Sequence, residues 1–466
     1  MFIGRETELE SLDCCYRSEK QEVVVIYGRR RIGKTSLINK FCADKPDVIR
    51  FVGFEGNAKL LLSALCDAVT SKLDVSFRNF NPENIRSILE SVFKASRNDK
   101  KLIFVIDEFP YLVKEFPETM GILQELIDEY KEKGNLKLIL SGSSVSFMER
   151  QVLANPSPLY GRRTLSIHLK EFTINEAALL FEGINITNFD LMTIYSITGG
   201  VPLYLQLFAE RSSWKESLRA LFFQRNGYLY NEPRTLLLME LREPANYYSI
   251  CLLLSHGVNR VSELADKSGF TTAAVSAILK RLEVIGIVEL KESIHSKVRK
   301  PHWVIVDSLF AFYFQFIMPF SALIEMESIN GVEEYFNSHI NAFVGKCFEK
   351  LALMHFIKSN PSFGVVKFGS WWGNNPHLKR EEEIDIVIQG VNGSWVFGEC
   401  KWTESKVGIS VLDTLKSRAE LVIQNANKLY VLYSKTGFTE ELLKLAEVDK
   451  SIRCISFSEM LEEHKN

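Results

Sequence analysis

The sequence has almost no net charge, because 56 Lys and Arg residues stand against 58 Asp and Glu residues in a chain of 466, which leaves −2. Without an excess of one sign, no overall field draws the protein onto nucleic acid or anionic lipid, so any such binding must come from local patches. Internal repeats and low-complexity tracts are also missing. A chain of this length exceeds what one hydrophobic core supports, so we expect about two to four domains.

Patterns typical of structural zinc, secretion and membranes are weak or missing. The eight cysteines are scattered, with no C-x-x-C pair and no zinc-like spacing to histidines, which favours a reducing, cytoplasmic location. The N-terminus has no apolar signal core. One apolar stretch, Trp303 to Ile324, is long enough to span a bilayer, but Asp307, Gln315 and Pro319 interrupt it. We therefore predict a buried strand and a core helix there, and no membrane partner.

The most informative motif is a glycine-rich loop, G-R-R-R-I-G-K-T at 28–35, between a strand-like apolar run and a helical pattern. Its glycines let backbone N–H groups and the helix N-terminus face a polyphosphate. We expect Lys34 to reach the β- and γ-phosphates and the Thr35 hydroxyl to ligate Mg²⁺. The arginine run adds positive field or is simply solvated. The predicted nucleotide-binding residues of the loop are Gly28, Arg29, Arg30, Arg31, Ile32, Gly33, Lys34, Thr35 and Ser36.

A second acidic motif follows the apolar run 103–106. Asp107, at the end of this strand, is predicted to hold Mg²⁺ beside Thr35, and Glu108 to orient and deprotonate the attacking water. A solvated turn is the alternative, and the upstream phosphate loop makes it the weaker one.

Two further groups are candidates for acting on the γ-phosphate. Ser143 or Ser141, after the strand 136–140, is a candidate sensor, although serines after a strand often only cap a loop. Arg162 is a candidate for stabilising the charge of phosphoryl transfer, in cis or from a neighbouring subunit. An ordinary surface arginine is the alternative.

The order of predicted elements divides the chain. Strands alternate with helices over the first 170 residues, which predicts an α/β fold with a parallel, doubly wound sheet. The pattern then becomes helical, and residues 247–307 follow the helix, helix, helix, strand, strand order of a winged helix. We predict a phosphate-loop NTPase domain at 1–170, a helical lid at 171–240, a winged helix at 241–310, a linking core helix at 311–334 and an α/β domain at 335–466.

The predicted winged helix contains a candidate DNA-recognition helix that starts near residue 272. Because its exposed face has few basic residues, the alternative is a module that packs on the ATPase as a lid or spacer. The residues predicted to face DNA bases are Thr271, Thr272 and Ser276, and those of a basic wing are His295, Lys297, Arg299 and Lys300.

Charged residues on two consecutive strands suggest a metal site near the C-terminus. Asp385 lies on one strand, and Glu399 and Lys401 share a face of the next. Two carboxylates and the Cys400 carbonyl would coordinate Mg²⁺, with Glu349 as a third carboxylate, and Lys401 would activate or orient a water attacking phosphorus. A solvated strand edge is the alternative.

Five segments in order resemble the prokaryotic "archaeal ATPase" family, a branch near the AAA+ and STAND nucleotide switches. They are F-I-G-R-E at 2–6, the loop at 28–35, V-I-D-E-F at 105–109, L-S-G-S-S at 140–144 and G-G-V-P at 199–202. The resemblance implies ATP as the nucleotide, Phe2 and Arg5 near the adenine, and Pro202 in the lid over the base. No arginine stands at the usual AAA+ lid-sensor position near Pro202. Hexameric unfoldase or helicase behaviour is therefore not expected.

The C-terminal residues Glu349, Asp385, Glu399 and Lys401 resemble the motif of the PD-(D/E)XK nuclease fold over 335–466. This implies a restriction-endonuclease-like domain that cleaves DNA with Mg²⁺ or Mn²⁺, although some members of that fold only bind. Two hypotheses stay open: an ATP-driven switch coupled to a nuclease-like effector, and a regulatory or signalling ATPase that only binds DNA or protein partners. Self-association also stays open.

Overall fold

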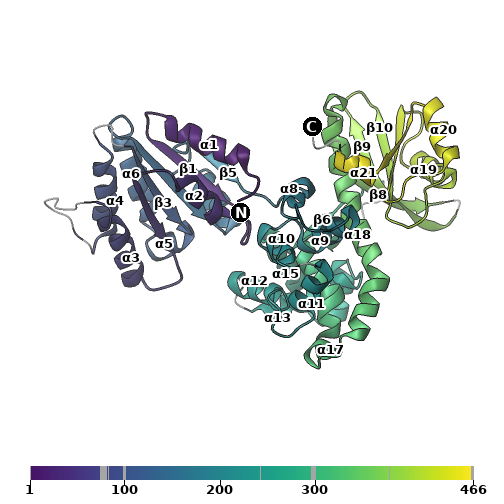
Figure 1. Cartoon of the computed structure of the whole chain (residues 1–466), viewed down its shortest axis with the longest axis horizontal. Helices are drawn as coiled ribbons and strands as arrows, with labels where there is room; N and C mark the ends of the chain where they lie inside the picture. The colour runs from purple at the N-terminus through teal and green to yellow at the C-terminus, as the bar shows by residue number, and fades with distance from the viewer. Residues whose placement is uncertain are drawn as a thin grey trace. The chain divides into compact units, whose positions relative to one another are not determined.

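A computed structural model describes residues 2–73, 81, 83–97, 101–211, 213–241, 243–294, 301–376 and 378–462. The chain divides into two compact units. Unit 1 is Met1–Phe172 with Val201–Tyr204, and unit 2 is Thr173–Gly200 with Leu205–Asn466. Figure 1 traces both units from purple at the N-terminus to yellow at the C-terminus.

Unit 1 is built on a five-stranded sheet of order β2-β3-β4-β1-β5, in which all neighbouring strands are parallel (Figure 1). This confirms the predicted α/β class with a parallel sheet. The central strands β3 and β4 are buried along their whole length, as their continuous apolar runs predict. The strands are β1 (Glu22–Tyr27), β2 (Val48–Val52), β3 (Leu102–Asp107), β4 (Leu136–Gly142) and β5 (Leu165–His168).

Helices cover both faces of this sheet. Residues of α1 and α2 join one apolar cluster with the strands, and residues of α3, α4, α5 and α6 join the cluster on the other face. The helices are α1 (Glu6–Arg17), α2 (Lys34–Cys42), α3 (Ala58–Thr70), α4 (Ile85–Ala95), α5 (Phe109–Glu115), α6 (Thr119–Tyr130), α7 (Val145–Phe147) and the π-helix η1 (Met148–Leu153).

The strand order decides where the functional groups of unit 1 meet. Because β4 lies between β1 and β3 and all three are parallel, their carboxyl ends share one edge of the sheet. That edge is where open α/β sheets bind their ligands. The loop after β1, the acidic pair after β3 and the serines after β4 are therefore neighbours.

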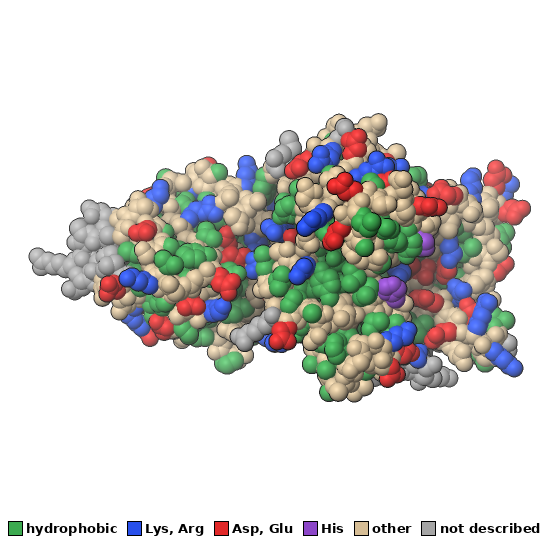
Figure 2. Space-filling view, turned by 90° about the horizontal axis from the view of Figure 1, so that it is seen from below, with side chains coloured by type: hydrophobic (Ala, Val, Ile, Leu, Met, Phe, Trp, Pro, Cys, Tyr) green, Lys and Arg blue, Asp and Glu red, His purple; other side chains and the backbone are tan. Residues whose placement is uncertain are grey.

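The first part of unit 2 is helical. On the face of the molecule shown in Figure 2, Lys and Arg side chains lie among Asp and Glu side chains over most of the surface. That mixture agrees with the net charge of −2. The helices are α8 (Ile174–Leu179), α9 (Asn188–Thr198), α10 (Pro202–Ala209, which begins in unit 1), α11 (Trp214–Phe222) and α12 (Glu232–Glu240).

The segment predicted as one linking helix at 311–334 is not a single helix. It contains the end of α16 (Ser308–Phe312), the π-helix η2 (Tyr313–Ile317), the 3₁₀-helix η3 (Met318–Phe320), α17 (Ser321–Glu325) and the start of α18 (Asn330–Ser359). Pro319 explains the 3₁₀ turn Met318–Phe320, since proline lacks the N–H that a continuing α-helix needs. The chain leaves the helical conformation at 326–329, where Glu327 has a left-handed φ of 58°.

Aromatic packing makes this segment a core element, as predicted. The rings of Phe312 and Phe316 lie 5.8 and 5.6 Å from that of Phe343 on α18. Among the described residues, the stretch Ser308–Glu325 is the one helical segment with the length and apolar composition of a membrane span, and 44% of that window is buried inside the fold.

Before this core segment in the chain, three helices and a small antiparallel sheet occur in the predicted order. They are α13 (Pro244–Ser255), α14 (Val261–Ser268), α15 (Thr272–Val284), β6 (Val288–Lys291) and β7 (His302–Ile305). The Thr271 hydroxyl caps α15 by accepting the Ala274 N–H at 3.2 Å. The predicted wing residues His295, Lys297, Arg299 and Lys300 lie outside the described residues.

The C-terminal part of unit 2 is a mixed five-stranded sheet of order β12-β11-β10-β9-β8. Strands β8, β9 and β10 are antiparallel, and β10, β11 and β12 are parallel. Residues of α19 and α20 pack on one face, and Phe348 of α18 contacts aromatic rings on the other. The elements are η4 (Pro361–Phe363), β8 (Val365–Asn375), β9 (Arg380–Gly390), β10 (Trp395–Lys401), α19 (Ile409–Val422), β11 (Lys428–Ser434), α20 (Glu440–Val448), β12 (Ile452–Ser456) and α21 (Phe457–Glu462).

Candidate functional site

The phosphate loop joins β1 to α2 and passes very close to the chain that follows β5. A Cβ atom on Gly28 would lie 2.3 Å from the carbonyl oxygen of Leu169, so a side chain at this position would force the loop to move. The loop ends at Lys34, the first residue of α2. Glycine at position 28 is therefore needed for steric reasons, in addition to its role in wrapping the loop around a phosphate.

Lys34 lies inside the loop rather than in solvent. Its side chain is 6% exposed, and Nζ donates to the carbonyl oxygens of Gly28 at 2.8 Å and Arg29 at 3.0 Å. Burial lowers the pKa of Lys34, and the carboxylates of Glu108 and Asp107 oppose this shift. The ammonium group is thus held where the charge of a polyphosphate would be received.

Thr35 and Asp107 are in direct contact. The Thr35 hydroxyl donates to Oδ2 of Asp107 at 2.8 Å, and Oδ1 of Asp107 accepts the N–H of Glu108 at 3.1 Å. A hydroxyl and a carboxylate side by side are hard oxygen donors of the kind that Mg²⁺ uses in nucleotide sites. These two residues therefore fit the predicted metal.

Glu108 is held in an unusual backbone conformation. Its φ of 50° and ψ of 46° are left-handed, which is rare for a residue with a side chain and is often found at functional sites. Its Oε2 accepts from the N–H of Ser143 at 3.2 Å and from the Ser143 hydroxyl at 2.7 Å. The serine after β4 therefore fixes the carboxylate after β3.

Gly53, just after β2, supports this arrangement. Its N–H donates to the carbonyl oxygen of Asp107 at 2.7 Å, and a Cβ atom there would lie 2.5 Å from the carbonyl oxygen of Glu108. Sequence reasoning missed Gly53, and the signal that could have found it is a lone glycine directly after a strand of the sheet.

Of the two candidate serines, the structure places Ser143 in contact with Glu108. Ser141 is fully buried, and its hydroxyl is among the buried polar atoms without a hydrogen-bond partner in the described part of the chain.

Arg162, the candidate for stabilising the charge of phosphoryl transfer, forms a two-pronged ion pair with Asp128 of α6, at 2.8 and 2.6 Å. Within the described residues its hydrogen bonds do not go to the phosphate loop, so its role in phosphoryl transfer stays a prediction.

The remaining predicted nucleotide residues have structural contacts of their own. Arg29 pairs with Glu171 at 3.5 Å, and Arg30 donates to the Tyr111 hydroxyl at 3.2 Å. The Arg5 guanidinium lies 4.7 Å from the centre of the Phe172 ring and also bonds the Lys170 carbonyl. Phe2 packs against the apolar cluster of α1 and α2, and Pro202 is buried at the start of α10. These contacts leave the adenine site a prediction.

In unit 2 the structure brings together the carboxylates predicted near the C-terminus. Oδ2 of Asp385 on β9 accepts the N–H of Cys400 on β10 at 2.8 Å, and Lys401 Nζ lies 2.6 Å from Oε1 of Glu399. Glu399 is 5% exposed. The strand pairing that aligns β9 with β10 therefore sets the spacing of these groups.

The carboxylates of this cluster repel one another. Burial raises the pKa of Asp385 well above its ordinary value, and the charges of Glu399 and Glu349 add to the shift. Burial and Glu383 raise the pKa of Glu349 to about 7. Burial by itself would lower the pKa of Lys401, but the charge and hydrogen bond of Glu399 have the larger effect, so the pKa of Lys401 is raised. The site therefore favours a cation near its carboxylates.

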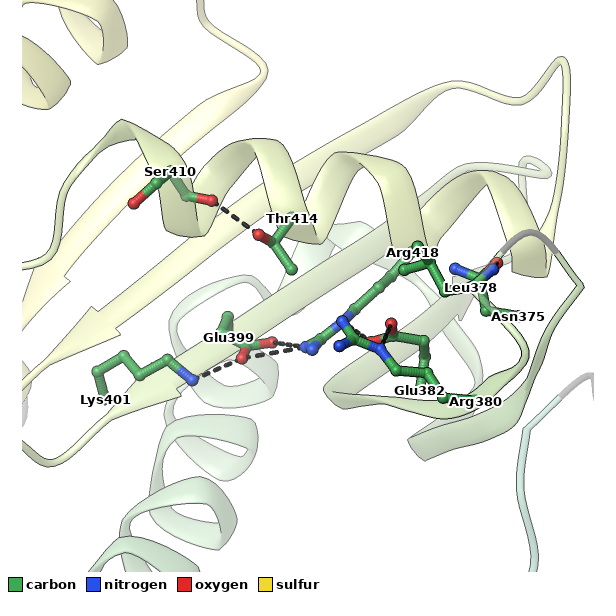
Figure 3. A network of polar contacts seen from close by, with 9 residues as sticks. All are labelled: Asn375, Leu378, Arg380, Glu382, Glu399, Lys401, Ser410, Thr414 and Arg418. Carbon is green, nitrogen blue, oxygen red and sulfur yellow. Dashed lines mark hydrogen bonds and ion pairs between the residues drawn. The ribbon is translucent and has the colours of Figure 1, made fainter.

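Arg418 of α19 supplies a cation that the sequence motif did not include (Figure 3). Its Nε donates to Glu382 at 2.8 Å, and one of its terminal nitrogens lies 3.4 and 3.5 Å from the two carboxylate oxygens of Glu399. Arg380 bonds the other oxygen of Glu382 at 2.8 Å. Glu399 thus lies between Lys401 and Arg418, and no sequence spacing links Arg418 to these strands.

Metal-binding geometry is not preformed in this cluster. Among the residues that the structure describes, no group of three or more His, Cys, Asp or Glu side chains is placed to hold a metal ion. The carboxylates of Glu349, Asp385 and Glu399 are hard donors that suit Mg²⁺ in type. One of them, Glu399, is already paired with Lys401 and Arg418.

The parallel sheet, the wrapped glycine-rich loop and the set Lys34, Thr35, Asp107 and Glu108 define a P-loop ATPase. Residues 2–208 match a family described as "ATPase domain predominantly from Archaea". Residues 313–412 match a family described as "Archaea bacterial proteins of unknown function".

Two known proteins are similar in sequence to this chain. The uncharacterized protein MJECL04 of Methanocaldococcus jannaschii is 32% identical over 427 residues, which cover 87% of this chain and 88% of that protein. The chain therefore belongs to this family of archaeal ATPases, which confirms the family prediction for the ATPase. The uncharacterized ATP-binding protein MJ1010 of the same organism is 27% identical over 144 residues, 30% of this chain and 36% of that protein.

A solved structure is similar to this chain in fold. The Walker-type ATPase PABY2304 of Pyrococcus abyssi is 19% identical, with a TM-score of 0.51 over 67% of this chain and 96% of that one.

Proposed function

We propose that the protein is an ATP-hydrolysing switch whose nucleotide state controls a C-terminal domain that acts on DNA. The observation that carries the proposal is the continuous set of contacts from Thr35 through Asp107 and Glu108 to Ser143. It links the phosphate loop to the ends of the two neighbouring strands. A site that only bound a nucleotide would not need a carboxylate held in a rare backbone conformation.

Each residue of this set has a role in hydrolysis. Lys34 binds the β- and γ-phosphates, and Thr35 with Asp107 holds Mg²⁺, which when bound supplies positive charge at those phosphates. Glu108 accepts the proton of the attacking water. The Ser143 hydroxyl, which now donates to Glu108, can turn to a γ-phosphate oxygen and release the carboxylate.

Two substitutions test this proposal. Lys34→Ala is expected to lose both ATP binding and turnover, and Glu108→Gln is expected to bind ATP but not hydrolyse it. Binding is measured with a fluorescent ATP analogue, and turnover by release of phosphate. Full turnover by Lys34→Ala would overturn the assignment.

The C-terminal cluster supports a second activity, Mg²⁺-dependent cleavage of DNA. The observation that favours it is Lys401 beside Glu399 and the buried Asp385, because surfaces that only bind DNA do not need acidic clusters. In this proposal Glu349, Asp385 and Glu399 hold the metal, and Lys401 orients the attacking water. The ion pair of Arg418 with Glu399 favours the alternative, in which this domain only binds DNA or a protein.

Cleavage of plasmid and linear DNA with Mg²⁺ or Mn²⁺, with and without ATP, separates these alternatives. If the domain is a nuclease, cleavage disappears in Asp385→Ala and Lys401→Ala. Absence of cleavage by the unaltered protein in every nucleotide state would rule out the nuclease proposal and favour the binding alternative. The segment 241–310 is proposed to act as a winged helix in either case, with Thr271, Thr272 and Ser276 toward DNA.

A further inference from the structure

The β6–β7 hairpin is joined to the edge of the C-terminal sheet. The N–H of Ile294 donates to the carbonyl oxygen of Ser370 at 3.0 Å. The Ser293 hydroxyl donates to the carbonyl oxygen of Trp372 and accepts its N–H, both at 2.9 Å. Because β8 is an edge strand, these bonds satisfy backbone groups that would otherwise be open.

Side chains of the hairpin also contact the C-terminal sheet. Ile294 is 2% exposed and belongs to the apolar core of the C-terminal sheet, with Trp371 and Ile384. On the returning strand, the His302 ring lies 4.4 Å from that of Trp372. The described segments on both sides of the hairpin tip are therefore fixed to β8.

This docking brings Lys291 toward the acidic cluster. Lys291 pairs with His302 across the hairpin, His302 contacts Trp372, and Trp372 pairs with Glu383 on β9. Burial and Glu383 raise the pKa of Glu349, and the charge of Lys291 opposes this shift, so the lysine acts on one carboxylate of the cluster.

Lys291 differs from the other cations near the cluster. Lys401 is paired with Glu399, and Arg418 with Glu382 and Glu399. Lys291 is exposed and forms no ion pair with any residue that the structure describes. An acidic cluster repels phosphate, so a nucleic-acid strand over it needs an available cation, and a lysine ammonium serves as a point charge for phosphate.

We propose that the described end of β6, which is docked on β8 through Ser293 and Ile294, is part of the C-terminal site, and that Lys291 binds a phosphodiester group of the nucleic-acid strand that lies over the carboxylates. The inference rests on the proposed nucleic-acid role of the C-terminal domain. It assigns to the hairpin a contact with the substrate of that domain in addition to any contact made by α15.

The test compares Lys291→Ala, Lys291→Arg and the unaltered full-length protein. The matched control is Lys267→Ala, which removes an exposed lysine of α14 in the same three-helix segment. The probes are a DNA duplex and an RNA duplex of the same sequence, which distinguish the two sources of a phosphodiester. Affinity is measured by fluorescence anisotropy over a range of salt concentrations, and KM and kcat are measured wherever cleavage occurs.

Lys291→Ala is expected to weaken binding about 3- to 10-fold and to reduce the salt slope by about one counterion. Lys291→Arg and Lys267→Ala are expected to bind like the unaltered protein, and cleavage should change in KM rather than kcat. Unchanged binding by Lys291→Ala would overturn the hairpin inference alone. If the unaltered protein binds neither duplex, the nucleic-acid role and the inference both fail, and the ATPase assignment stands on its separate assay.

Discussion

The two charged sites of this protein are held together in different ways. In unit 1, Lys34, Thr35, Asp107 and Glu108 are positioned by main-chain groups and by strand ends that the parallel sheet aligns. In unit 2, burial and neighbouring carboxylates raise the pKa values of Asp385 and Glu349, and Glu399 is paired with Lys401 and Arg418. The first site is ordered by backbone geometry, and the second by opposing charges.

The largest expected effect concerns the site that backbone geometry orders. Glu108→Gln keeps the shape of the side chain but cannot accept a proton, so ATP turnover should fall about 1,000-fold with ATP affinity unchanged. Steady-state phosphate release measures the rate. Glu118→Gln, an exposed glutamate at the start of α6, is the control and should keep full turnover.

Arg418→Ala tests the dependence of the second site on charge. It leaves the buried Glu382 and Glu399 with one partner fewer, so unit 2 should lose about 3 kcal/mol of stability. Because all six tryptophans lie in unit 2, their fluorescence during denaturant unfolding reports this unit. Arg86→Ala breaks the exposed pair Arg86–Glu125 and should cost at most about 1 kcal/mol, read by circular dichroism. Equal costs would contradict the contrast between a buried network and a surface pair.

The charge of Glu349 should make the stability of unit 2 depend on pH. Its pKa rises from 4.5 to about 7 in the folded protein, so the folded state binds more protons than the unfolded state between these values. The stability that this group contributes is present below pH 4.5 and is lost as the pH rises through about 7. Glu349→Gln should therefore stabilise unit 2 by about 3 kcal/mol at pH 8 and have little effect at pH 4.5. A gain that does not depend on pH would contradict this cause.

Gly53→Ala is the mildest change to the ATP site. The added Cβ would press on the carbonyl oxygen of Glu108, so the carboxylate should shift and turnover should fall about 10-fold. Gly121→Ala in α6, where a Cβ atom would meet nothing within 4 Å, is the control. Normal turnover by Gly53→Ala would show that Glu108 does not need this close approach.

The same contrast explains what could be predicted from the sequence. The alternation of strands and helices and the residues at the strand ends are local patterns, so the parallel sheet, its family and the place of Asp107 at a strand end could be predicted, whereas the choice between Ser141 and Ser143 stayed open. The contact of Ser143 with Glu108 could not be predicted, because it depends on which strands are neighbours. Arg418 and Ser293 reach their partners through tertiary packing, which leaves no spacing to recognise. The helix predicted at 311–334 is not continuous, because Pro319 removes a backbone hydrogen-bond donor and the chain turns again at 326–329.

We propose that the nucleotide state of unit 1 controls the action of unit 2 on DNA. The most direct test is the affinity of the full-length Glu108→Gln protein for a DNA duplex, measured without nucleotide, with ADP and with ATP. Because this variant is expected to hold ATP without hydrolysing it, its affinity for DNA with ATP should differ at least about 5-fold from that with ADP. Identical DNA affinities in all three states, with ATP binding verified in the same samples, would contradict it.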